Sequence, residues 1–318
     1  MISVAMTTYN GEKYVLKQLA SIYNQTRRVD EVIICDDCSK DDTVLIITNY
    51  IKNNNIKNCK LYINDERLGF IQNFWNCISL TTGDIVFLSD QDDIWETTKV
   101  ERLASLLMKN SNIKSIFAEM RYIDAHDSYI KYNNHHGNGI IPTIKHLFDK
   151  KYYNIDYKEF IKTGGYQGAS IAFKKEIFDV IKHFDVRGKF AHDVLINFYA
   201  SILNGFYVTK EKLTRYRLHS SNTLGIPLYR RRDRVDVLLE SIKICNELKE
   251  LTTYCKCKDT SIDFENINNY IDSLINVYKL RVDNLRGKNL LGQLVLFRYI
   301  GFFSSLKTFI GDIRDILF

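Results

Sequence analysis

The chain has 318 residues, of which 45% are hydrophobic and 26% are charged. This composition is typical of a globular protein and excludes a largely disordered chain. The formal net charge of +6 suits an anionic substrate or an anionic membrane surface. The basic residues are spread along the chain, apart from Arg230–Arg234, so we predict no nucleic-acid partner.

Cysteine and histidine spacing predicts no structural zinc site. The seven cysteines are irregularly spaced, and the pairs Cys35/Cys38 and Cys255/Cys257 lack a second pair at suitable spacing. His135 and His136 likewise lack further ligands, which favours an exposed turn. No secretory signal is expected, because Met1 leads directly into a strand pattern, so we predict a cytoplasmic protein with reduced thiols.

Residues 1–95 alternate between two hydrophobic patterns. Apolar runs predict buried strands, and apolar residues at the helical period predict helices between them. The expected strands are residues 2–6, 31–35, 60–63 and 85–89, and the expected helices are residues 12–24, from 41 onward, and from about 67 to 80. Repeated strand–helix units are typical of α/β proteins with a parallel sheet and right-handed crossovers.

The remaining chain divides into a mixed segment and a helical segment. We expect helices at residues 96–109, 174–183 and from 190, and strands at 114–120, 169–173 and 206–208. We expect irregular chain at residues 122–158 and extended chain at 213–222. Helical patterns then cover residues 229–257, 264–285 and 290–318. We therefore predict a domain over residues 1–225, with halves 1–95 and 96–225, and a helical region over 226–318.

An acidic cluster follows the most hydrophobic strand pattern. The apolar run Ile85–Ser89 is followed at once by Asp90, Asp92 and Asp93. Open α/β sheets bind their ligands at the carboxyl ends of the strands. Carboxylates this close repel one another unless a cation lies between them, and Mg²⁺ or Mn²⁺ binds a few protein oxygens together with substrate phosphates. The alternative from spacing alone is a solvated acidic turn.

Polar residues also follow the first two predicted strands. Thr7 and Tyr9 come after the first strand, and Asp36 and Asp37 follow the second. Neither the Gly-x-Gly-x-x-Gly fingerprint nor a P-loop is present. A nucleotide at this edge would therefore be bound by side chains and a cation.

Two further groups of polar residues lie in the second half of the chain. Asp193 falls in the first turn of a predicted helix, where it acts either as a helix cap or as a carboxylate base. Arg215, Arg217 and His219 alternate along an extended segment and can face one side. They bind a diphosphate or form the polar face of a surface strand.

The C-terminal segment combines basic and apolar residues. From Lys279 to the end there are seven Lys/Arg and three Asp/Glu, which gives a net charge of +4. Such interleaving suits a helix lying on an anionic bilayer, and it equally suits a helical cap packed on the domain. No apolar run reaches the ~18 residues that a spanning helix needs.

Taken together, six motifs resemble glycosyltransferase family 2, the inverting sugar transferases of GT-A fold, over about the first 220 residues. They are Thr7-Thr-Tyr-Asn10, Ile34-Cys-Asp-Asp-Cys-Ser39 with Asp42-Thr43, Arg67-Leu-Gly-Phe70, Ser89-Asp-Gln-Asp-Asp-Ile-Trp95, His192-Asp193 and Tyr216-Arg-Leu-His-Ser-Ser-Asn222. The fourth is similar to the bacterial rhamnosyltransferase-like polysaccharide branch. The resemblance implies a Rossmann-like, mostly parallel central sheet flanked by helices, with a helical C-terminal extension.

The resemblance also implies roles for residues of the nucleotide-binding half. Thr7 and Tyr9 would flank the nucleotide. Asp37 would hydrogen-bond the base, and Arg67 would lie near the base or the phosphates. Asp90 would reach the ribose or the metal shell.

Four more residues match the chemical machinery of the family. Asp92 would bind Mn²⁺ or Mg²⁺ directly, and Asp193 would be the catalytic base. Arg217 and His219 would close over the diphosphate.

Two departures from the family pattern bear on function. His192 precedes Asp193 where the family often has Glu, which leaves the role of this position open. Tyr216-Arg217 stands where processive synthases have Gln-x-x-Arg-Trp, which implies one sugar added per encounter.

The sequence thus predicts a metal-dependent, non-processive hexosyl- or rhamnosyltransferase of cell-surface polysaccharide synthesis, such as capsule or lipopolysaccharide. Its donor would be a UDP- or dTDP-linked sugar, and its acceptor a hydroxyl of a saccharide or lipid-linked saccharide. The expected location is the cytoplasm or the inner face of the cell membrane. The alternatives are a haloacid dehalogenase-type phosphohydrolase, which also has Asp-x-Asp after a strand, and an inactive nucleotide-sugar-binding subunit.

Overall fold

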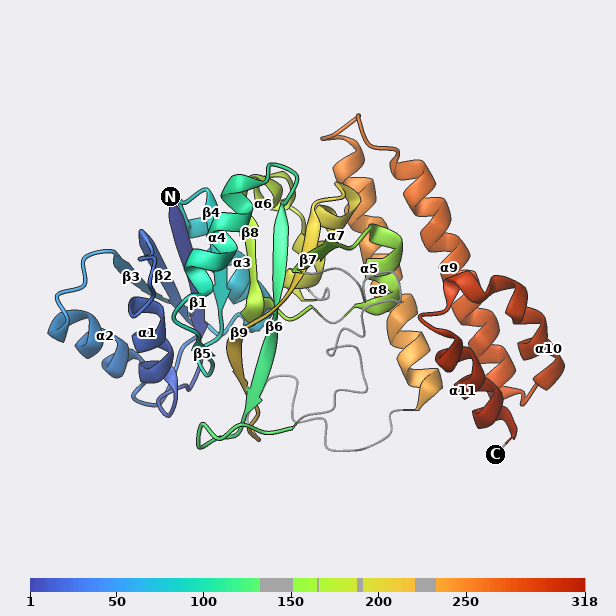
Figure 1. The fold of residues 1–318 in the computed structure, drawn as a ribbon, viewed down its shortest axis with the longest axis horizontal. Coiled ribbons are helices and arrows are strands. Elements are labelled where there is room, and N and C mark those ends of the chain that lie inside the picture. Colours follow the sequence, from blue (N-terminus) through green and yellow to red (C-terminus); the bar gives the residue numbers. More distant parts are fainter. Residues whose placement is uncertain (132–150, 165, 188–190, 221–232, 318) are drawn as a thin grey trace. The chain divides into compact units, whose positions relative to one another are not determined.

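The structure is a computed structural model that describes residues 1–131, 151–164, 166–187, 191–220 and 233–317 (Figure 1). His135, His136 and the basic residues 230–232 lie outside these ranges. The chain forms two compact units: one comprises Met1–Tyr157 and Gly164–Ile226, and the other comprises Lys158–Thr163 and Pro227–Phe318.

The first half of the sheet is parallel, as predicted. It contains β1 (Ile2–Thr8), β2 (Glu31–Asp36), β3 (Cys59–Ile63) and β4 (Ile85–Ser89), in the order β3-β2-β1-β4. Every residue of β1, β2 and β4 is buried, because helices cover both faces of this part of the sheet. This double burial explains the continuous apolar runs in the sequence.

Helices α1 (Val15–Tyr23), α2 (Thr43–Asn53) and α4 (Lys99–Lys109) pack on one face of the sheet, and α3 (Phe70–Leu80) covers β1 and β2 on the other (Figure 1). Three of them, α1, α3 and α4, begin about three residues later than predicted. The residues preceding α1 and α4 form turns instead, in which Tyr14 N donates to Gly11 O and Lys99 N donates to Glu96 O.

The second half of the sheet is mixed, so short antiparallel pairings add to the mostly parallel sheet that the sequence predicts. β8 (Ile171–Lys174) lies between β4 and β6 (Ser115–Ile123) and is antiparallel to both. β5 (Ile94–Trp95) and β7 (Tyr152–Asn154) are antiparallel to β9 (Phe206–Arg217), which is parallel to β6. A hydrophobic pattern indicates burial but not strand direction, so the sequence could not reveal this change.

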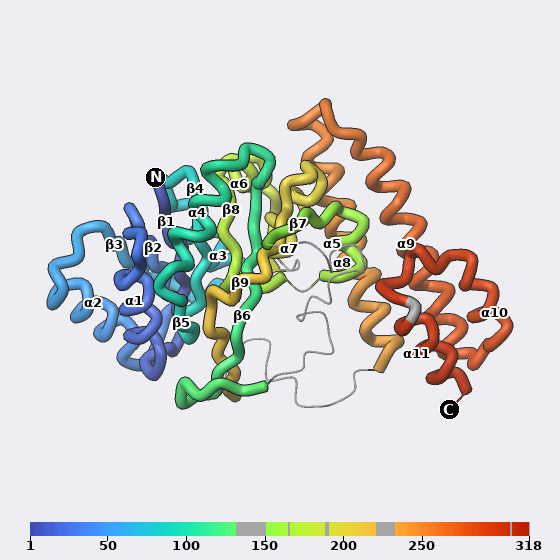
Figure 2. Tube along the Cα trace, viewed as in Figure 1, coloured from blue at the N-terminus to red at the C-terminus, as the bar shows by residue number. Residues whose placement is uncertain are grey.

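β9 corrects one expectation. Residues 206–217 form one long strand rather than a short strand followed by a separate extended segment. It pairs in parallel with β6 along its length, and the pairing register shifts around Glu119 (Figures 1 and 2). Despite this shift, β9 is one continuous strand from Phe206 to Arg217. The remaining short elements of this part of the chain are α5 (Tyr157–Thr163), the 3₁₀ helix η2 (Gly168–Ser170), α6 (Lys175–Ile181) and α7 (His192–Ile202).

The C-terminal region is helical, as predicted, but its last segment is broken. α8 (Arg234–Lys256) and α9 (Phe264–Arg286) are followed by α10 (Leu290–Val295), the 3₁₀ helix η3 (Leu296–Phe302) and α11 (Leu306–Leu317). The break comes at Phe303, whose backbone is extended. Buried Asp312 joins these elements by accepting hydrogen bonds from Arg234 and Arg281. Within the ranges that the structure describes, no helix combines the length and apolar character needed to cross a bilayer.

Candidate active site

The acidic cluster lies at the end of β4 and is removed from water to different degrees. Asp90 and Asp92 are half-buried, and Asp93 is fully buried. Desolvation, followed by the charges of Asp92 and Asp193, raises the pKa of Asp90 to about 7. The contribution of Asp193 is informative because this residue lies on α7, far along the chain. The predicted metal-binding turn and the predicted base therefore share one electrostatic environment.

Asp193 is held by backbone donors at the start of α7. Its carboxylate accepts hydrogen bonds from Gly168 N at 2.6 Å and from Val194 N at 2.8 Å. Burial nevertheless raises the pKa of Asp193 to about 6. A carboxylate with this pKa is mostly ionised at neutral pH and is a better proton acceptor than an exposed aspartate.

Lys99 is a site residue that the sequence interpretation missed. Its side chain is fully buried, and its Nζ donates to Ala169 O at 2.7 Å and to Thr214 Oγ1 at 2.9 Å. Nζ also lies 4.1 Å from the centroid of the Trp95 ring. Burial lowers the pKa of Lys99 to about 7, against the opposing charges of Asp93 and Asp90. The only sequence signal was a lysine on the core-facing side of an amphipathic helix.

Arg217 clamps the acidic turn from the end of β9. Its buried guanidinium donates from Nε to Asp92 O at 2.6 Å and from Nη1 to Asp124 O at 2.9 Å. Nη2 lies 2.6 Å from the carboxylate of Asp127, and the guanidinium stacks on the Tyr14 ring. These contacts are all with protein groups. The predicted binding of a diphosphate by Arg217 therefore stays a prediction.

His219 and Arg215 have different partners, although they alternate with Arg217. His219 Nε2 lies 2.8 Å from Asp92 Oδ2, so this histidine touches the predicted metal ligand. Arg215 instead makes a two-pronged contact with Glu96, at 2.9 and 3.1 Å. The segment thus brings Arg217 and His219, but not Arg215, to the acidic turn.

The predicted nucleotide-binding residues line the neighbouring strand ends. Thr7 is buried at the end of β1. Tyr9 is tied to the acidic turn, because its N–H donates to Gln91 Oε1 and its carbonyl accepts from Gln91 Nε2. The Arg67 guanidinium lies 4.1 Å from the Tyr9 ring centroid. Arg67, Tyr9 and the acidic turn are therefore neighbours.

Asp37 holds the loop that precedes α3. Its two carboxylate oxygens accept hydrogen bonds from Leu68 N at 2.7 Å, Gly69 N at 2.9 Å and Asn64 Nδ2 at 3.0 Å. Gly69 has a φ of +79°, a conformation that glycine adopts readily. Asp37 thereby places Arg67. Its predicted hydrogen bond to a base remains untested.

A divalent cation fits the charge of the acidic turn. Among the described residues, no group of three or more His, Cys, Asp and Glu side chains is arranged to hold a metal ion. Asp90 and Asp92 alone suit Mg²⁺ or Mn²⁺, because such ions use one or two carboxylates and take the remaining ligands from substrate phosphates and water. Burial, followed by the charges of Asp92 and Asp193, raises the pKa of Asp90, and a cation bound beside it would favour its ionised form.

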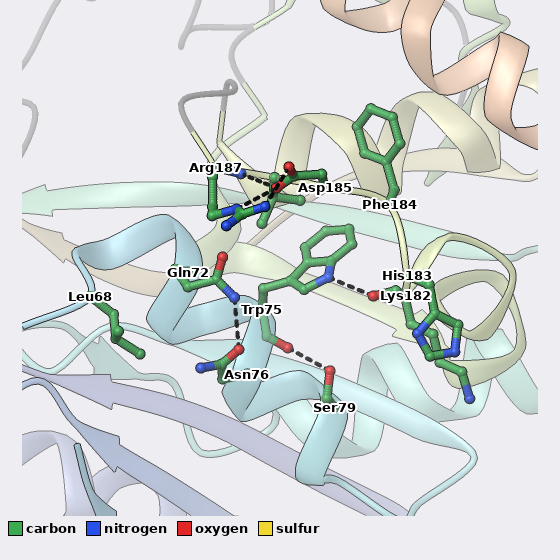
Figure 3. Close-up of a pocket in the computed structure, with 11 residues that line it drawn as sticks. Leu68, Gln72, Trp75, Asn76, Ser79, Lys182, His183, Phe184, Asp185 and Arg187 are labelled. Atoms are coloured by element: carbon green, nitrogen blue, oxygen red, sulfur yellow. Dashed lines mark hydrogen bonds and ion pairs between the residues drawn. The ribbon is translucent and has the colours of Figure 1, made fainter. Parts of the chain in front are cut away.

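A cavity of about 520 Å³ lies elsewhere, between α3 and residues 182–187 (Figure 3). Trp75 Nε1 donates to Lys182 O there, and Arg187 pairs with Asp185. None of the predicted site residues lines this cavity. The cavity therefore has no bearing on the predicted roles of those residues.

Comparison with protein families gives a match over most of the first unit. The model described as "Glycosyl transferase family 2" matches residues 3–182. This agrees with the family indicated by the sequence motifs and contradicts the phosphohydrolase alternative.

Curated relatives with functional names include a rhamnosyltransferase and a glucosyltransferase. The dTDP-rhamnosyl transferase RfbG of Shigella flexneri is 28% identical over 232 residues, which cover 69% of this chain and 73% of the relative. The UDP-Glc:alpha-D-GlcNAc-diphosphoundecaprenol beta-1,3-glucosyltransferase WfgD of Escherichia coli is 27% identical over 124 residues, which cover 39% of this chain and 47% of that protein.

Solved structures of S. aureus TarS share the fold. The UDP complex of TarS 1-349 superposes with a TM-score of 0.57 at 17% identity and covers 98% of this chain and 91% of that chain. The UDP-GlcNAc complex gives a TM-score of 0.57 at 18% identity, with 98% and 81% covered. The expected GT-A architecture is thus confirmed.

The first prediction concerns the cost of ionising Asp90. Its pKa of about 7 in the folded protein exceeds the ordinary value of 3.8, so Asp90 contributes stability at low pH that is lost as the pH rises through 7. Relative to wild type, Asp90→Asn should therefore gain about 1–3 kcal/mol of unfolding free energy between pH 4 and pH 7, allowing for screening at a half-buried group.

Urea denaturation in EDTA at several pH values measures this difference. Asp65→Asn, which changes an exposed acid after β3, is the matched control and should follow the wild-type curve. If Asp90→Asn also follows that curve, Asp90 ionises without cost and the electrostatic account is wrong.

Proposed function

The chain belongs to glycosyl transferase family 2, and from this premise we propose that it transfers one sugar from a nucleotide-sugar to a hydroxyl of a saccharide acceptor, with inversion. The observation that supports the proposal is that the charge of Asp193 acts on Asp90, so the carboxylate that we propose as the base is within electrostatic range of the acidic turn. An in-line displacement needs these two features together: a base behind the acceptor hydroxyl and positive charge beside the leaving diphosphate.

In the proposed reaction, the acceptor oxygen attacks the anomeric carbon from the face opposite the nucleotide. Asp193 takes the hydroxyl proton as the new carbon–oxygen bond forms. The bond to the β-phosphate oxygen breaks, and the nucleoside diphosphate leaves with the electron pair. Mn²⁺ or Mg²⁺ held by Asp90 and Asp92 would supply positive charge beside that diphosphate.

The surrounding residues support this arrangement. Lys99 connects α4 to η2 and β9, and η2 contains Gly168, the donor to Asp193. Arg217 holds the backbone of the acidic turn from β9. His219 contacts Asp92, so we propose that Arg217 and His219 close over the diphosphate once the donor is bound. Thr7, Tyr9, Asp37 and Arg67 would bind the nucleoside.

We further propose that the donor is a UDP- or dTDP-linked sugar and that the acceptor is a saccharide or lipid-linked saccharide of a cell-surface polysaccharide. The names of RfbG and WfgD, a dTDP-rhamnosyl and a UDP-Glc transferase, support these two nucleotide classes. Tyr216-Arg217 in place of the processive motif supports a single addition.

The C-terminal unit carries a surface suited to an anionic bilayer. Leu291, Leu294, Val295 and Phe297 are exposed on α10 and the start of η3, with Leu291 77% exposed. Exposed Lys288 and Arg298 flank them in the sequence. Apolar residues bordered by basic ones are typical of interfacial helices, and we propose that this face binds the membrane that holds a lipid-linked acceptor.

The second prediction tests the base. Asp193→Asn should lower kcat by about 10²–10⁴-fold, because it removes general base catalysis. In wild type, kcat should fall below pH 6, since the pKa of Asp193 is about 6 and its protonated form cannot accept a proton. The measurement is nucleoside diphosphate release from a panel of UDP-, dTDP- and GDP-sugars with Mn²⁺ and saccharide acceptors.

Donor binding provides the control for this variant. Asp193→Asn should bind the preferred donor with unchanged affinity. An active Asp193→Asn enzyme would remove the base assignment. A wild-type protein that binds donor but never transfers it would favour the inactive-subunit alternative.

The third prediction tests the cation site. Asp92→Ala should abolish the part of nucleotide affinity that depends on Mn²⁺, because it removes a carboxylate ligand. Calorimetric titration of UDP and dTDP with Mn²⁺ and with EDTA measures this part directly. Asp65→Asn serves again as the control, and equal metal dependence in Asp92→Ala and wild type would contradict the assignment.

The fourth prediction tests the membrane surface. Replacing Leu291 and Phe297 together by Ser should reduce sedimentation with vesicles that contain anionic lipid by about tenfold, because two exposed apolar anchors are lost. A Leu45→Ser/Leu16→Ser protein, altered at exposed leucines of the first unit, is the control. Binding that is equal in both proteins, or absent in wild type, would show that this face does not bind the bilayer.

A further inference from the structure

His192 is a buried side chain with unused hydrogen-bonding capacity. It is 4% exposed, and neither Nδ1 nor Nε2 has a hydrogen-bond partner in the part of the chain that the structure describes. A neutral imidazole has one donor and one acceptor, and the great majority of buried polar groups are hydrogen-bonded. Burial lowers the pKa of His192 to about 3, so the ring is neutral under physiological conditions.

The ring lies directly beside the proposed base. A Cβ added to Gly168 would stand 3.2 Å from His192 Nε2 and 3.3 Å from Asp193 Oδ2. The imidazole nitrogen and the carboxylate oxygen therefore border the same glycine.

The known neighbours of the ring cannot satisfy its nitrogens. One face of the ring stacks on Phe74, with a centroid distance of 4.2 Å and an interplanar angle of 22°. Gly168 has no side chain, and its N–H already donates to Asp193. The stack fixes the plane of the ring and directs its polar edge away from Phe74. Among the described residues no protein group pairs with these nitrogens, and a ligand in the site could supply a partner.

We propose that His192 is a specificity-determining residue, whose ring nitrogens hydrogen-bond a hydroxyl group of the sugar that reacts beside Asp193. The inference rests on the proposed function, because it takes Asp193 as the base. A hydroxyl both donates and accepts, so it can satisfy either nitrogen of a neutral imidazole. A carboxylate at this position would add charge next to Asp193 and Asp90, whereas a neutral ring adds a polar contact without repulsion.

The proposal explains a cost that the ligand-free protein carries. Leaving a buried polar group without a partner is unfavourable, and a ligand that supplies the missing partner recovers this free energy. A site built in this way discriminates strongly against a sugar that lacks the hydroxyl, because the ring is then left unpaired in the complex. Selection of the sugar is therefore the role that fits this residue.

The test compares His192→Phe with wild type. Phenylalanine keeps a ring that can stack on Phe74 and removes both nitrogens. We expect kcat/KM with the preferred donor and acceptor to fall about 10- to 100-fold, as for loss of a hydrogen bond in a buried site. His192→Gln, which retains a donor and an acceptor, should recover part of this loss. His183→Phe, the same change at an exposed histidine, should leave kcat/KM unchanged.

Deoxy substrates separate recognition from a structural role. Wild type should lose activity with one monodeoxy sugar, and His192→Phe should treat that sugar and its parent alike. If the sensitive sugar is a donor analogue, the hydroxyl belongs to the donor, and if it is an acceptor analogue, the hydroxyl belongs to the acceptor. Wild-type kcat/KM in His192→Phe, or unchanged deoxy discrimination, would overturn the inference and leave the proposed function intact.

Thermal unfolding of the ligand-free proteins gives an independent readout. His192→Phe should be at least as stable as wild type, because the unpaired nitrogens contribute no hydrogen bond to the folded state. A Tm several degrees below wild type would show that the nitrogens have protein partners, which would also overturn the inference. If wild type transfers no sugar from any donor, the proposed function fails, and the inference fails with it.

Discussion

Three carboxyl groups lie within one short turn at the end of β4, and a fourth reaches the same place from α7. This arrangement is unfavourable, since all four carboxyl groups are partly or wholly removed from water. The charges of Asp92 and Asp193 oppose ionisation of Asp90, and those of Asp92 and Asp90 oppose ionisation of Asp93. The positive charge of Lys99 acts on Asp93 and Asp90. Backbone N–H groups donate to Asp93 and Asp193. Burial and the neighbouring charges still raise the pKa of Asp90, and the divalent cation that we propose here would favour its ionised form.

The same contacts that balance this charge also hold the site together. Lys99 begins α4, yet its ammonium group binds η2 and β9, which come much later in the chain. Arg217 ends β9, yet it donates to the backbone of the acidic turn. The site is therefore assembled from separate segments by two buried cations. Replacing Lys99 by a neutral residue would remove the positive charge that faces Asp93 and Asp90, and removing one partner of buried charges typically destabilises a protein by about 3–5 kcal/mol.

Two adjacent residues at the start of α7, His192 and Asp193, differ in their hydrogen-bond partners. Asp193 and His192 are neighbours in the first turn of one helix, and both are buried. Asp193 has its backbone donors, whereas the His192 nitrogens have no partner among the residues described. Proximity to a proposed base makes such an unpaired group informative, because a buried polar atom without a partner is unfavourable unless a ligand completes it.

Much of this protein could be predicted from the sequence. The apolar runs of β1, β2 and β4 and the helical periods between them required only local patterns, because a strand buried on both faces is apolar throughout. The family motifs likewise identified Asp92, Asp193, Arg217 and His219 as candidates, since such residues occur at fixed places along the chain.

Tertiary structure alone decided the rest. The direction of β8, the continuity of β9 and the break at Phe303 depend on partners distant in sequence. The role of Lys99 was hidden for the same reason, because a lysine in an amphipathic helix is normally exposed and only its partners on η2 and β9 explain its burial. The sequence thus determined which residue types stand at the strand ends. Long-range packing decided which of these residues meet and which, like His192, have no partner among the described residues. The reason is that hydrogen bonds and charges act through space rather than along the chain.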